Sequence, residues 1–196
     1  MEGNLVSHPI SIDNLQAIWS LCFSPNGKKL ACSTYNDIRV YDVECGALIL
    51  GLLEGHNCIL WSHDSNKLFS ASREKEIRCW NSETGEQIGQ PWIGHTNWIR
   101  SLSLLSNGLV LASVSLDNTV RFWDAASGNQ VGQHVQRINA PPAVCFSPFS
   151  ESLVLWGGDG SIYLWQGPWM DFLLVKPCAA ATFTRASPLA LTVSQI

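Results

Sequence analysis

The chain has 196 residues, of which 46% are hydrophobic and 14% charged, with a formal net charge of -4 at pH 7. This composition excludes a highly charged, disordered chain, because enough apolar surface is present to form a core. No basic field is available to hold nucleic acid. The longest apolar run, 47–53, is far shorter than the roughly 20 residues of a membrane span, and residues 1–12 lack the build of a signal peptide. We therefore expect a cytoplasmic protein, with the nucleus as the alternative, that binds neither nucleic acid nor membrane.

Seven cysteines form an odd set with wide gaps and no C-x-x-C pair. This pattern fits neither a disulfide framework nor a zinc ribbon, and it favours a reducing compartment in which buried thiols pack as small hydrophobes. The one metal-like cluster is His56, Cys58 and His63. Three such ligands could hold Zn²⁺ with a fourth from elsewhere, but a turn histidine and a strand cysteine explain them better. We expect no metal and no cofactor.

An aromatic residue returns along the chain at intervals of 39, 43 and 42 residues, at Tyr41, Trp80, Trp123 and Trp165. An upstream apolar position steps almost in parallel, by 38, 43 and 42 residues, through Phe23, Trp61, Leu104 and Phe146. Two independent markers with one period indicate an internal repeat of about 40 residues.

Each repeat unit reads as short antiparallel strands joined by tight turns. In chain order the turn signals are Asn26-Gly27 and Cys45-Gly46, then Thr84-Gly85, then Asn107-Gly108 and Ser127-Gly128, then Asp159-Gly160. The third unit predicts strands over 99–104, 109–115, 119–124 and 129–132. No helical periodicity of useful length is present. We therefore expect four strands per unit and an all-β fold.

The units resemble WD40 repeats, above all the third, with Gly94-His95, then Ile99-Arg100-Ser101-Leu102, then residues 111–124, which end in Phe122-Trp123-Asp124. The resemblance covers about residues 13–166 and implies a β-propeller of four-stranded blades. It divides the chain into a flank (1–12), a degenerate first repeat (13–47), a shortened second (53–89), a third (93–132), a fourth (137–175) and an irregular tail (176–196). Residues 88–96 resemble WD40 arrays of mushroom-type fungi.

The resemblance implies a structural hydrogen-bond set in each blade, from a histidine to a strand serine, a turn aspartate and a tryptophan. The third unit would supply His95, Ser115, Asp117 and Trp123. The second would supply His56, Ser72 and Trp80, with Glu74 in the aspartate place, and the fourth would keep Asp159 and Trp165. In the fourth unit Gly157 and Arg137 replace the serine and the histidine, and the first unit keeps only Ser33.

A His-Ser-Asp set is also the composition of a catalytic triad. A nucleophilic serine must be exposed beside an oxyanion hole, whereas Ser115 lies in an apolar strand and the set recurs in part at the repeat period. No G-x-S-x-G elbow, phosphate-binding loop or H-E-x-x-H motif is present. We therefore expect a structural role and no enzymatic activity.

Two departures from the repeat matter for the architecture. Only five residues separate His56 from Trp61, against nine from His95 to Leu104, so we expect the innermost strand of the second unit to lack four residues. After Trp165, either 170–175 supplies a last outer strand or the repeat stops.

Four blades with the curvature of a larger ring leave both end faces uncovered, so a tight four-bladed ring, an assembly of chains or a piece of a longer array are the alternatives. We favour an open arc that self-associates through its exposed blade edges or is marginally stable.

A propeller offers a rigid surface to other proteins, so the sequence predicts a protein-protein interaction scaffold or regulatory module. The alternative is a truncated remnant of a longer array without a partner of its own. By position in the family, the contact residues would be Thr34, Arg73, Leu116 and Gly158 before the turns, with Asn57 and Trp98 near the Gly-His loop. Trp98 and Arg73 are the preferred contacts, because such residues often anchor interfaces, although Trp98 could instead pack against a neighbouring blade.

Overall fold

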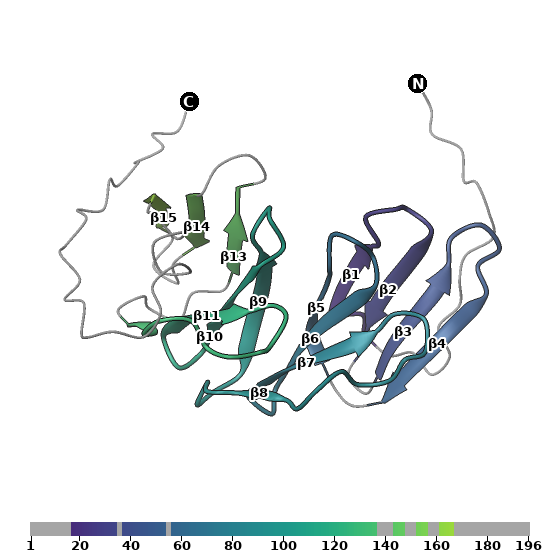
Figure 1. Ribbon diagram of the computed structural model, residues 1–196, viewed down its shortest axis with the longest axis horizontal. Helices are drawn as coiled ribbons and strands as arrows, with labels where there is room; N and C mark the ends of the chain where they lie inside the picture. Colours follow the sequence, from purple (N-terminus) through teal and green to yellow (C-terminus); the bar gives the residue numbers. More distant parts are fainter. Residues whose placement is uncertain are drawn as a thin grey trace, which may run out of the picture.

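A computed structural model describes residues 17–34, 37–53, 56–136, 143–147, 152–156 and 161–166. All regular structure in these residues is β-strand, arranged in four antiparallel sheets along an open arc (Figure 1). The predicted all-β fold of repeated antiparallel sheets is therefore confirmed. We call the sheets blades 1 to 4 in chain order.

The blades are built from strands that follow one another in sequence. Blade 1 contains β1 (Ser20–Phe23), β2 (Lys29–Ser33), β3 (Asp37–Asp42) and β4 (Leu48–Leu53). Blade 2 contains β5 (His56–Trp61), β6 (Lys67–Ser72), β7 (Glu76–Asn81) and β8 (Trp92–Ile93). Blade 3 contains β9 (Ile99–Leu104), β10 (Val110–Ser115), β11 (Thr119–Asp124) and β12 (Val135–Gln136). The described strands of blade 4 are β13 (Ala143–Phe146), β14 (Ser152–Trp156) and β15 (Ile162–Gln166).

The two periodic markers of the sequence flank a leucine at the same register in every blade. The upstream markers Phe23, Trp61, Leu104 and Phe146 lie opposite Leu30, Leu68, Leu111 and Leu153. These leucines lie opposite Tyr41, Trp80, Trp123 and Trp165 on the next strand. Cross-strand neighbours are the packing unit of a sheet. Each blade therefore contains one row made of a marker, a leucine and the second marker, which is why the two markers repeat with the same period.

Successive blades pack face to face, with the first strands β1, β5, β9 and β13 as neighbours. One apolar cluster joins blades 1 and 2 around Trp61 and Trp80, and a second joins blades 2 and 3 around Phe69, Trp92 and Trp123. A third joins blades 3 and 4 around Phe122 and Leu153. The core is therefore distributed over three inter-blade layers, and each blade depends on its neighbours for burial.

Two expectations about strands were wrong. The outer strand of blade 3 is β12, at residues 135–136, and in the predicted stretch 129–132 only Gln130 forms an isolated bridge, to Trp123. In blade 2 the first strand β5 is six residues long, like β9. His56 pairs with Ser72 as Ile99 pairs with Ser115, so the strand pairing of β5 is complete and the missing residues belong to the sequence before it.

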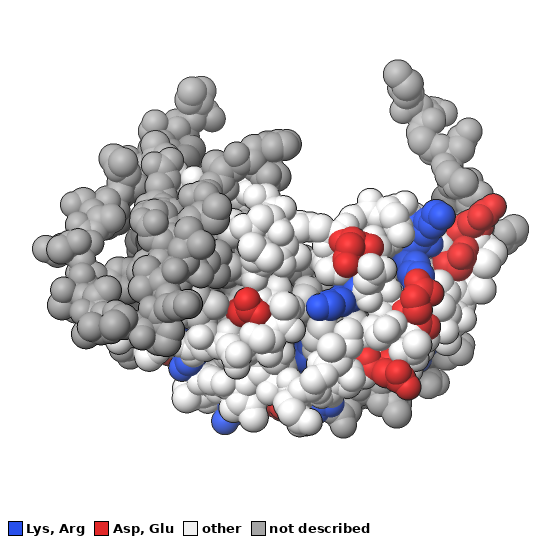
Figure 2. All heavy atoms as spheres, in the orientation of Figure 1, with Lys and Arg blue, Asp and Glu red and all other residues white. Residues whose placement is uncertain are grey.

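Acidic and basic side chains alternate over the first two blades, where Figure 2 shows them interspersed on one face. Three pairs are in contact: Lys29 with Glu83 at 2.7 Å, Arg39 with Asp37 at 2.8 Å and Arg78 with Glu76 at 2.5 Å. No large field of one sign forms on this face, in keeping with the small net charge. The described residues include no helix that is long and apolar enough to cross a membrane.

Candidate functional site

Blade 3 holds a continuous buried hydrogen-bond chain. The Trp123 indole Nε1 donates to Ser113 Oγ at 2.8 Å, and Ser113 Oγ lies 2.7 Å from His95 Nε2. On the other side of the imidazole, Nδ1 lies 2.9 Å from Asp117 Oδ2. Asp117 also accepts hydrogen bonds from the Thr96 amide at 2.9 Å and the Thr119 hydroxyl at 2.6 Å. Each polar side-chain atom of His95, Ser113, Asp117 and Trp123 therefore has a hydrogen-bond partner.

The structure brings together three of the four predicted members, His95, Asp117 and Trp123, but the serine is Ser113 and not Ser115. Trp123 lies opposite Leu111, so its indole reaches the side chain two residues along the same face. Ser115 lies about 7 Å further along the strand. Its hydroxyl instead donates to the Asn97 carbonyl at 2.9 Å and accepts from the Asp117 amide at 3.1 Å. Ser115 thus holds the neighbouring loop.

The same correction applies in blade 2, where Trp80 donates to Ser70 at 2.7 Å and not to Ser72. The Ser72 hydroxyl accepts from the Glu74 amide at 3.0 Å, and Glu74 itself is exposed, outside the buried layer. The His56 backbone lies in β5, at the register position of Ile99 and not of His95.

At the serine position blades 1 and 4 carry Cys32 and Leu155, which match Ser113 by register. Ser33, the serine predicted for blade 1, is buried, and its hydroxyl has no partner among the described residues.

The electrostatics of the blade 3 chain favour a neutral histidine beside an ionised aspartate. Burial lowers the pKa of His95, although the hydrogen bond to Asp117 acts in the opposite direction. Burial alone would raise the pKa of Asp117, but hydrogen bonds from Thr119, the Thr96 amide and His95 outweigh it and hold this pKa at about 2. At pH 7 the imidazole Nδ1–H therefore donates to the carboxylate, and Nε2 accepts from Ser113.

Ser113, His95 and Asp117 have the connectivity of a catalytic triad, but their environment does not suit catalysis. The Ser113 side chain is fully buried and already accepts the Trp123 indole, and His95 is buried as well. A nucleophilic serine must reach its substrate. The packing around this set is also tight at Gly94, which precedes His95. A Cβ there would lie 2.9 Å from Arg121 Nη1 and 3.0 Å from the Trp123 ring. The arrangement is that of a packed structural set.

A second constellation lies where three blades meet the solvent at one edge. Trp19 directly precedes β1, Arg73 directly follows β6 and Trp98 directly precedes β9. The Arg73 guanidinium carbon lies 4.5 Å from the centroid of the Trp98 ring and 5.2 Å from that of Trp19. Both indoles remain accessible, with 48% of Trp19 and 37% of Trp98 exposed. We call these three residues the Trp-Arg-Trp stack.

The stack contains the two preferred predicted contacts and one residue that the sequence analysis missed. Trp19 shares with Trp98 a place immediately before a first strand, which is the signal that could have identified it. Leu116 lies beside the stack, because its amide donates to the Trp98 carbonyl at 2.9 Å. Thr34 was wrongly predicted as a contact: it is fully buried, and its hydroxyl bonds the Asp37 carboxylate. Gly158 and Asp159 lie outside the described residues, as do the side chains of Asn57, His56 and Trp165.

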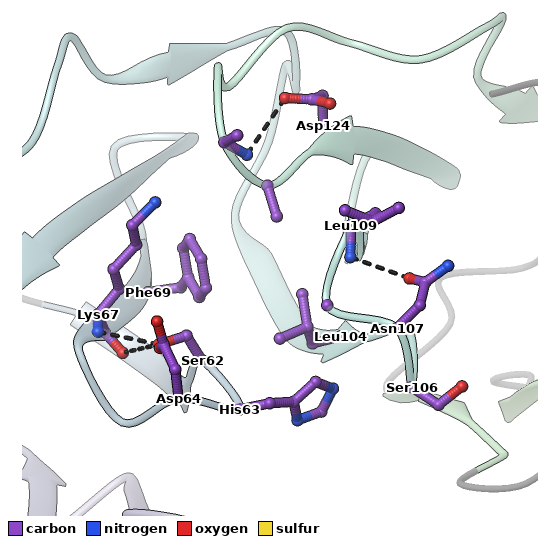
Figure 3. Close-up of a pocket in the computed structure, with 13 residues that line it drawn as sticks. Ser62, His63, Asp64, Lys67, Phe69, Leu104, Ser106, Asn107, Leu109 and Asp124 are labelled. Carbon is purple, nitrogen blue, oxygen red and sulfur yellow. Dashed lines mark hydrogen bonds between the residues drawn. The ribbon is translucent and has the colours of Figure 1, made fainter. Parts of the chain in front are cut away.

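The opposite edge of the junction between blades 2 and 3 has a shallow pocket of about 350 Å³ (Figure 3). In it His63 Nε2 lies 2.9 Å from the Leu105 carbonyl oxygen, and the Ser62 hydroxyl donates to Asp64 at 2.5 Å. The Ser62 hydrogen bond, with a smaller contribution from the charge of Lys67, lowers the pKa of Asp64. His63 therefore links two blades, and no group of three or more potential metal ligands occurs among the described residues. We assign the pocket no chemistry.

The repeated antiparallel sheets pack face to face, and one of them holds a buried hydrogen-bond set from a histidine to a tryptophan. These features define a protein built from β-propeller blades. A family model for the WD domain, G-beta repeat, matches residues 8–42, 48–81 and 85–124, which is more than half of the sequence. The chain belongs to the WD40 repeat family.

The relatives and structural neighbours are longer proteins. The U5 small nuclear ribonucleoprotein 40 kDa protein of Dictyostelium discoideum is 30% identical over 168 residues, covering 82% of this chain and 47% of the relative. The DDB1- and CUL4-associated factor 13 of Xenopus laevis is 26% identical over 85 residues, or 41% of this chain and 19% of the relative. The solved structure of U3-55K has a TM-score of 0.74 at 21% identity, over 81% of this chain and 51% of that one. This chain thus spans about half the length of the proteins it matches over most of its own length.

Proposed function

We propose that this chain is a non-enzymatic protein-protein interaction module that binds its partner through the Trp-Arg-Trp stack. The observation that carries the proposal is the position of Arg73 between two exposed indoles, 4.5 Å and 5.2 Å from their centroids. Tryptophan and arginine are the residues most often found at the energetic centre of protein interfaces. Stacking holds the guanidinium in place, so less side-chain entropy is lost when a partner binds.

The geometry of the blades supports this role. Each member of the stack lies next to the end of a strand whose backbone is tied into a four-stranded sheet. The three residues come from three successive blades, so their relative positions are set by the inter-blade cores. A surface with fixed anchors binds with little reorganisation. Ser115, which lies outside the buried His95 set, holds the segment before Trp98 through its hydrogen bond to the Asn97 carbonyl.

The names of the relatives support a class of partner and a compartment. One relative is named as a ribonucleoprotein component and another as an associated factor of DDB1 and CUL4, so we infer that this chain joins a multiprotein assembly. We propose the nucleus as its compartment, because the relative with 82% coverage of this chain is named as a small nuclear ribonucleoprotein protein. The expectation of a cytoplasmic location has no support among these names. Direct binding of nucleic acid stays unexpected on the net charge of -4, and a relationship to arrays of mushroom-type fungi stays a proposal.

The proposal is tested by affinity capture with mass spectrometry, using the full chain and three variants. We expect Trp98→Ala and Arg73→Ala each to weaken partner binding by about 2 kcal/mol, a roughly 30-fold rise in Kd, because anchor residues at interface centres contribute this much. The control is Leu109→Ser, an exposed apolar residue in the turn between β9 and β10. Equal Tm values would show that the variants fold.

Two outcomes would contradict the proposal. If the captured proteins bind both stack variants as well as they bind the Leu109→Ser control, the stack is not the contact surface. If no protein is retained specifically by the unmodified chain, the alternative of a remnant without a partner is favoured.

A further inference from the structure

Each blade presents two faces of different character, which can be read from its first strand. Because side chains alternate along a strand, Phe23, Trp61, Leu104 and Phe146 share one set of faces, and their preceding neighbours Cys22, Leu60, Ser103 and Cys145 share the other. We call the first set the leading faces and the second the trailing faces. Leading faces carry large apolar side chains at the first strand, and most trailing faces carry small ones there.

At each of the three junctions a leading face packs on the trailing face of the preceding blade. Trp61 of blade 2 donates its indole N–H to the Cys22 carbonyl of blade 1 at 3.1 Å. Leu102 and Leu104 of blade 3 pack in one cluster with Cys58 and Leu60 of blade 2. The Phe146 amide of blade 4 donates to the Ser103 hydroxyl of blade 3 at 2.8 Å. One rule therefore describes every junction: large side chains on the leading face cover the trailing face before it.

Among the described residues, the rule leaves one face of each kind without a neighbouring blade. The leading face of blade 1 carries Leu21 and Phe23, which are 57% and 62% exposed. Their counterparts in blades 2 to 4, namely Ile59, Trp61, Leu102, Leu104, Val144 and Phe146, are all buried. The trailing face of blade 4 exposes Cys145, Trp156 and Ile162, which lie on one side of the sheet by register.

We propose that two copies of this chain join head to tail, the leading face of blade 1 in each packing on the trailing face of blade 4 in the other. The two faces have the size relation of the internal junctions, with Leu21 and Phe23 set against the small Cys145. All five side chains are uncharged, so their burial carries no charge-desolvation cost. By the internal register, the Phe23 amide would lie beside Cys145 of the second copy, as the Phe146 amide lies beside Ser103.

A second copy suits these faces because it closes the arc. Two arcs of four blades make eight, which is within the range of about four to eight blades that propellers use. The pair has a two-fold axis, so the same junction forms twice and neither end face stays open. An open head-to-tail series would continue to add copies and leave apolar ends in solution.

The test measures the mass of the purified full chain by size-exclusion chromatography with light scattering. We expect a mass twice the 21.6 kDa of one chain, unchanged on moderate dilution. Phe23→Asp should shift the mass to that of one chain, because each ring would then carry a charge at both junctions. The matched control is Ile93→Asp in β8, where an apolar side chain 78% exposed lies away from both end faces. This control should keep the doubled mass.

A second measurement does not depend on how the variants fold. The thiols of Cys45 and Cys145 are both exposed in the single chain. We expect maleimide to label Cys145 many times more slowly in the doubled species than in protein diluted far enough to give the mass of one chain, while Cys45 labels equally in both. A mass of one chain at all concentrations would overturn the proposal, and so would a mass that grows beyond two copies. Equal labelling of Cys145 and Cys45 in a doubled species would assign the contact to another surface and also overturn it.

Discussion

Ser113 illustrates how one side chain can serve several partners at once. Its oxygen accepts from the Trp123 indole and its proton is directed at His95, so a buried ring and a buried imidazole are both satisfied by one hydroxyl. In blade 2 the equivalent Ser70 accepts from Trp80 at 2.7 Å, and no imidazole among the described side chains bonds to it. The difference between the two serines permits a matched comparison.

We expect Ser113→Ala to destabilise the protein by about 1 to 3 kcal/mol for each group left without a partner. Two groups lose their partner in this variant, the Trp123 N–H and His95 Nε2, whereas Ser70→Ala strands the Trp80 N–H. Urea unfolding of both variants measures the difference. A loss for Ser113→Ala no larger than that for Ser70→Ala would contradict the shared role of Ser113.

The pKa directions of the same chain predict acid sensitivity. The pKa of His95 is lowered from 6.5 in the folded protein, so the unfolded chain takes up the proton first and stability falls as the pH drops below about 6.5. The pKa of Asp117 is lowered from 3.8 to about 2, which adds a further loss between those values. We expect Tm to fall from pH 7 to pH 5, and His95→Asn to flatten that part of the profile. An equally steep fall in the variant would assign the effect to other groups.

At the scale of the element, blade 3 combines the features that slow local opening. Its second strand β10 is buried at every position and pairs on both sides with ladders, and the adjacent β11 carries Trp123. Blade 1 has a shorter first strand whose Leu21 and Phe23 side chains are exposed. Few buried apolar contacts and exposed backbone bonds mark the parts of a protein that open first.

Hydrogen exchange should therefore protect residues 113–124 most strongly and β1 least. The comparison is best made by mass spectrometry on the full chain at low concentration, where contacts between copies do not contribute. Stronger protection of β1 than of β10 under those conditions would show that burial and ladder pairing do not rank the blades in this way.

At the scale of the whole molecule, stability depends on the junctions between blades. Ser103 on the trailing face of blade 3 is buried and accepts the Phe146 amide at 2.8 Å. A larger apolar side chain at this position would overpack the junction and leave that amide without its acceptor, each effect being worth about 1 to 3 kcal/mol.

We expect Ser103→Leu to raise hydrogen exchange in β13 far more than in β10 and β11, because blade 4 would detach while the inner ladders of blade 3 stay paired. The matched control is Ser127→Ala, where an exposed turn serine is replaced. Uniformly faster exchange in all the blades would indicate that the molecule opens as one unit.

The repeat and the arrangement of strands in sheets could be read from the sequence, because strand alternation, turn glycines and a 40-residue period are local signals. Three members of the buried set, His95, Asp117 and Trp123, were implied by the resemblance to WD40 repeats. The sequence did not distinguish Ser113 from Ser115, since both lie on one face of β10 and only the cross-strand register of Trp123 selects between them. It also did not show that the residues missing from the second repeat lie before β5 and not within it.

Contacts between blades could be decided only by the tertiary structure. Trp19, Arg73 and Trp98 are separated by more than 20 residues at each step, and no local pattern brings them together. The burial of Thr34 and the exposure of Leu21 and Phe23 likewise depend on which blade packs on which face. By itself the sequence determined what each blade is made of, because strands and turns form from near neighbours. Which surfaces remain for a partner was decided by the packing of one blade on the next, since burial depends on residues that are close only in the folded chain.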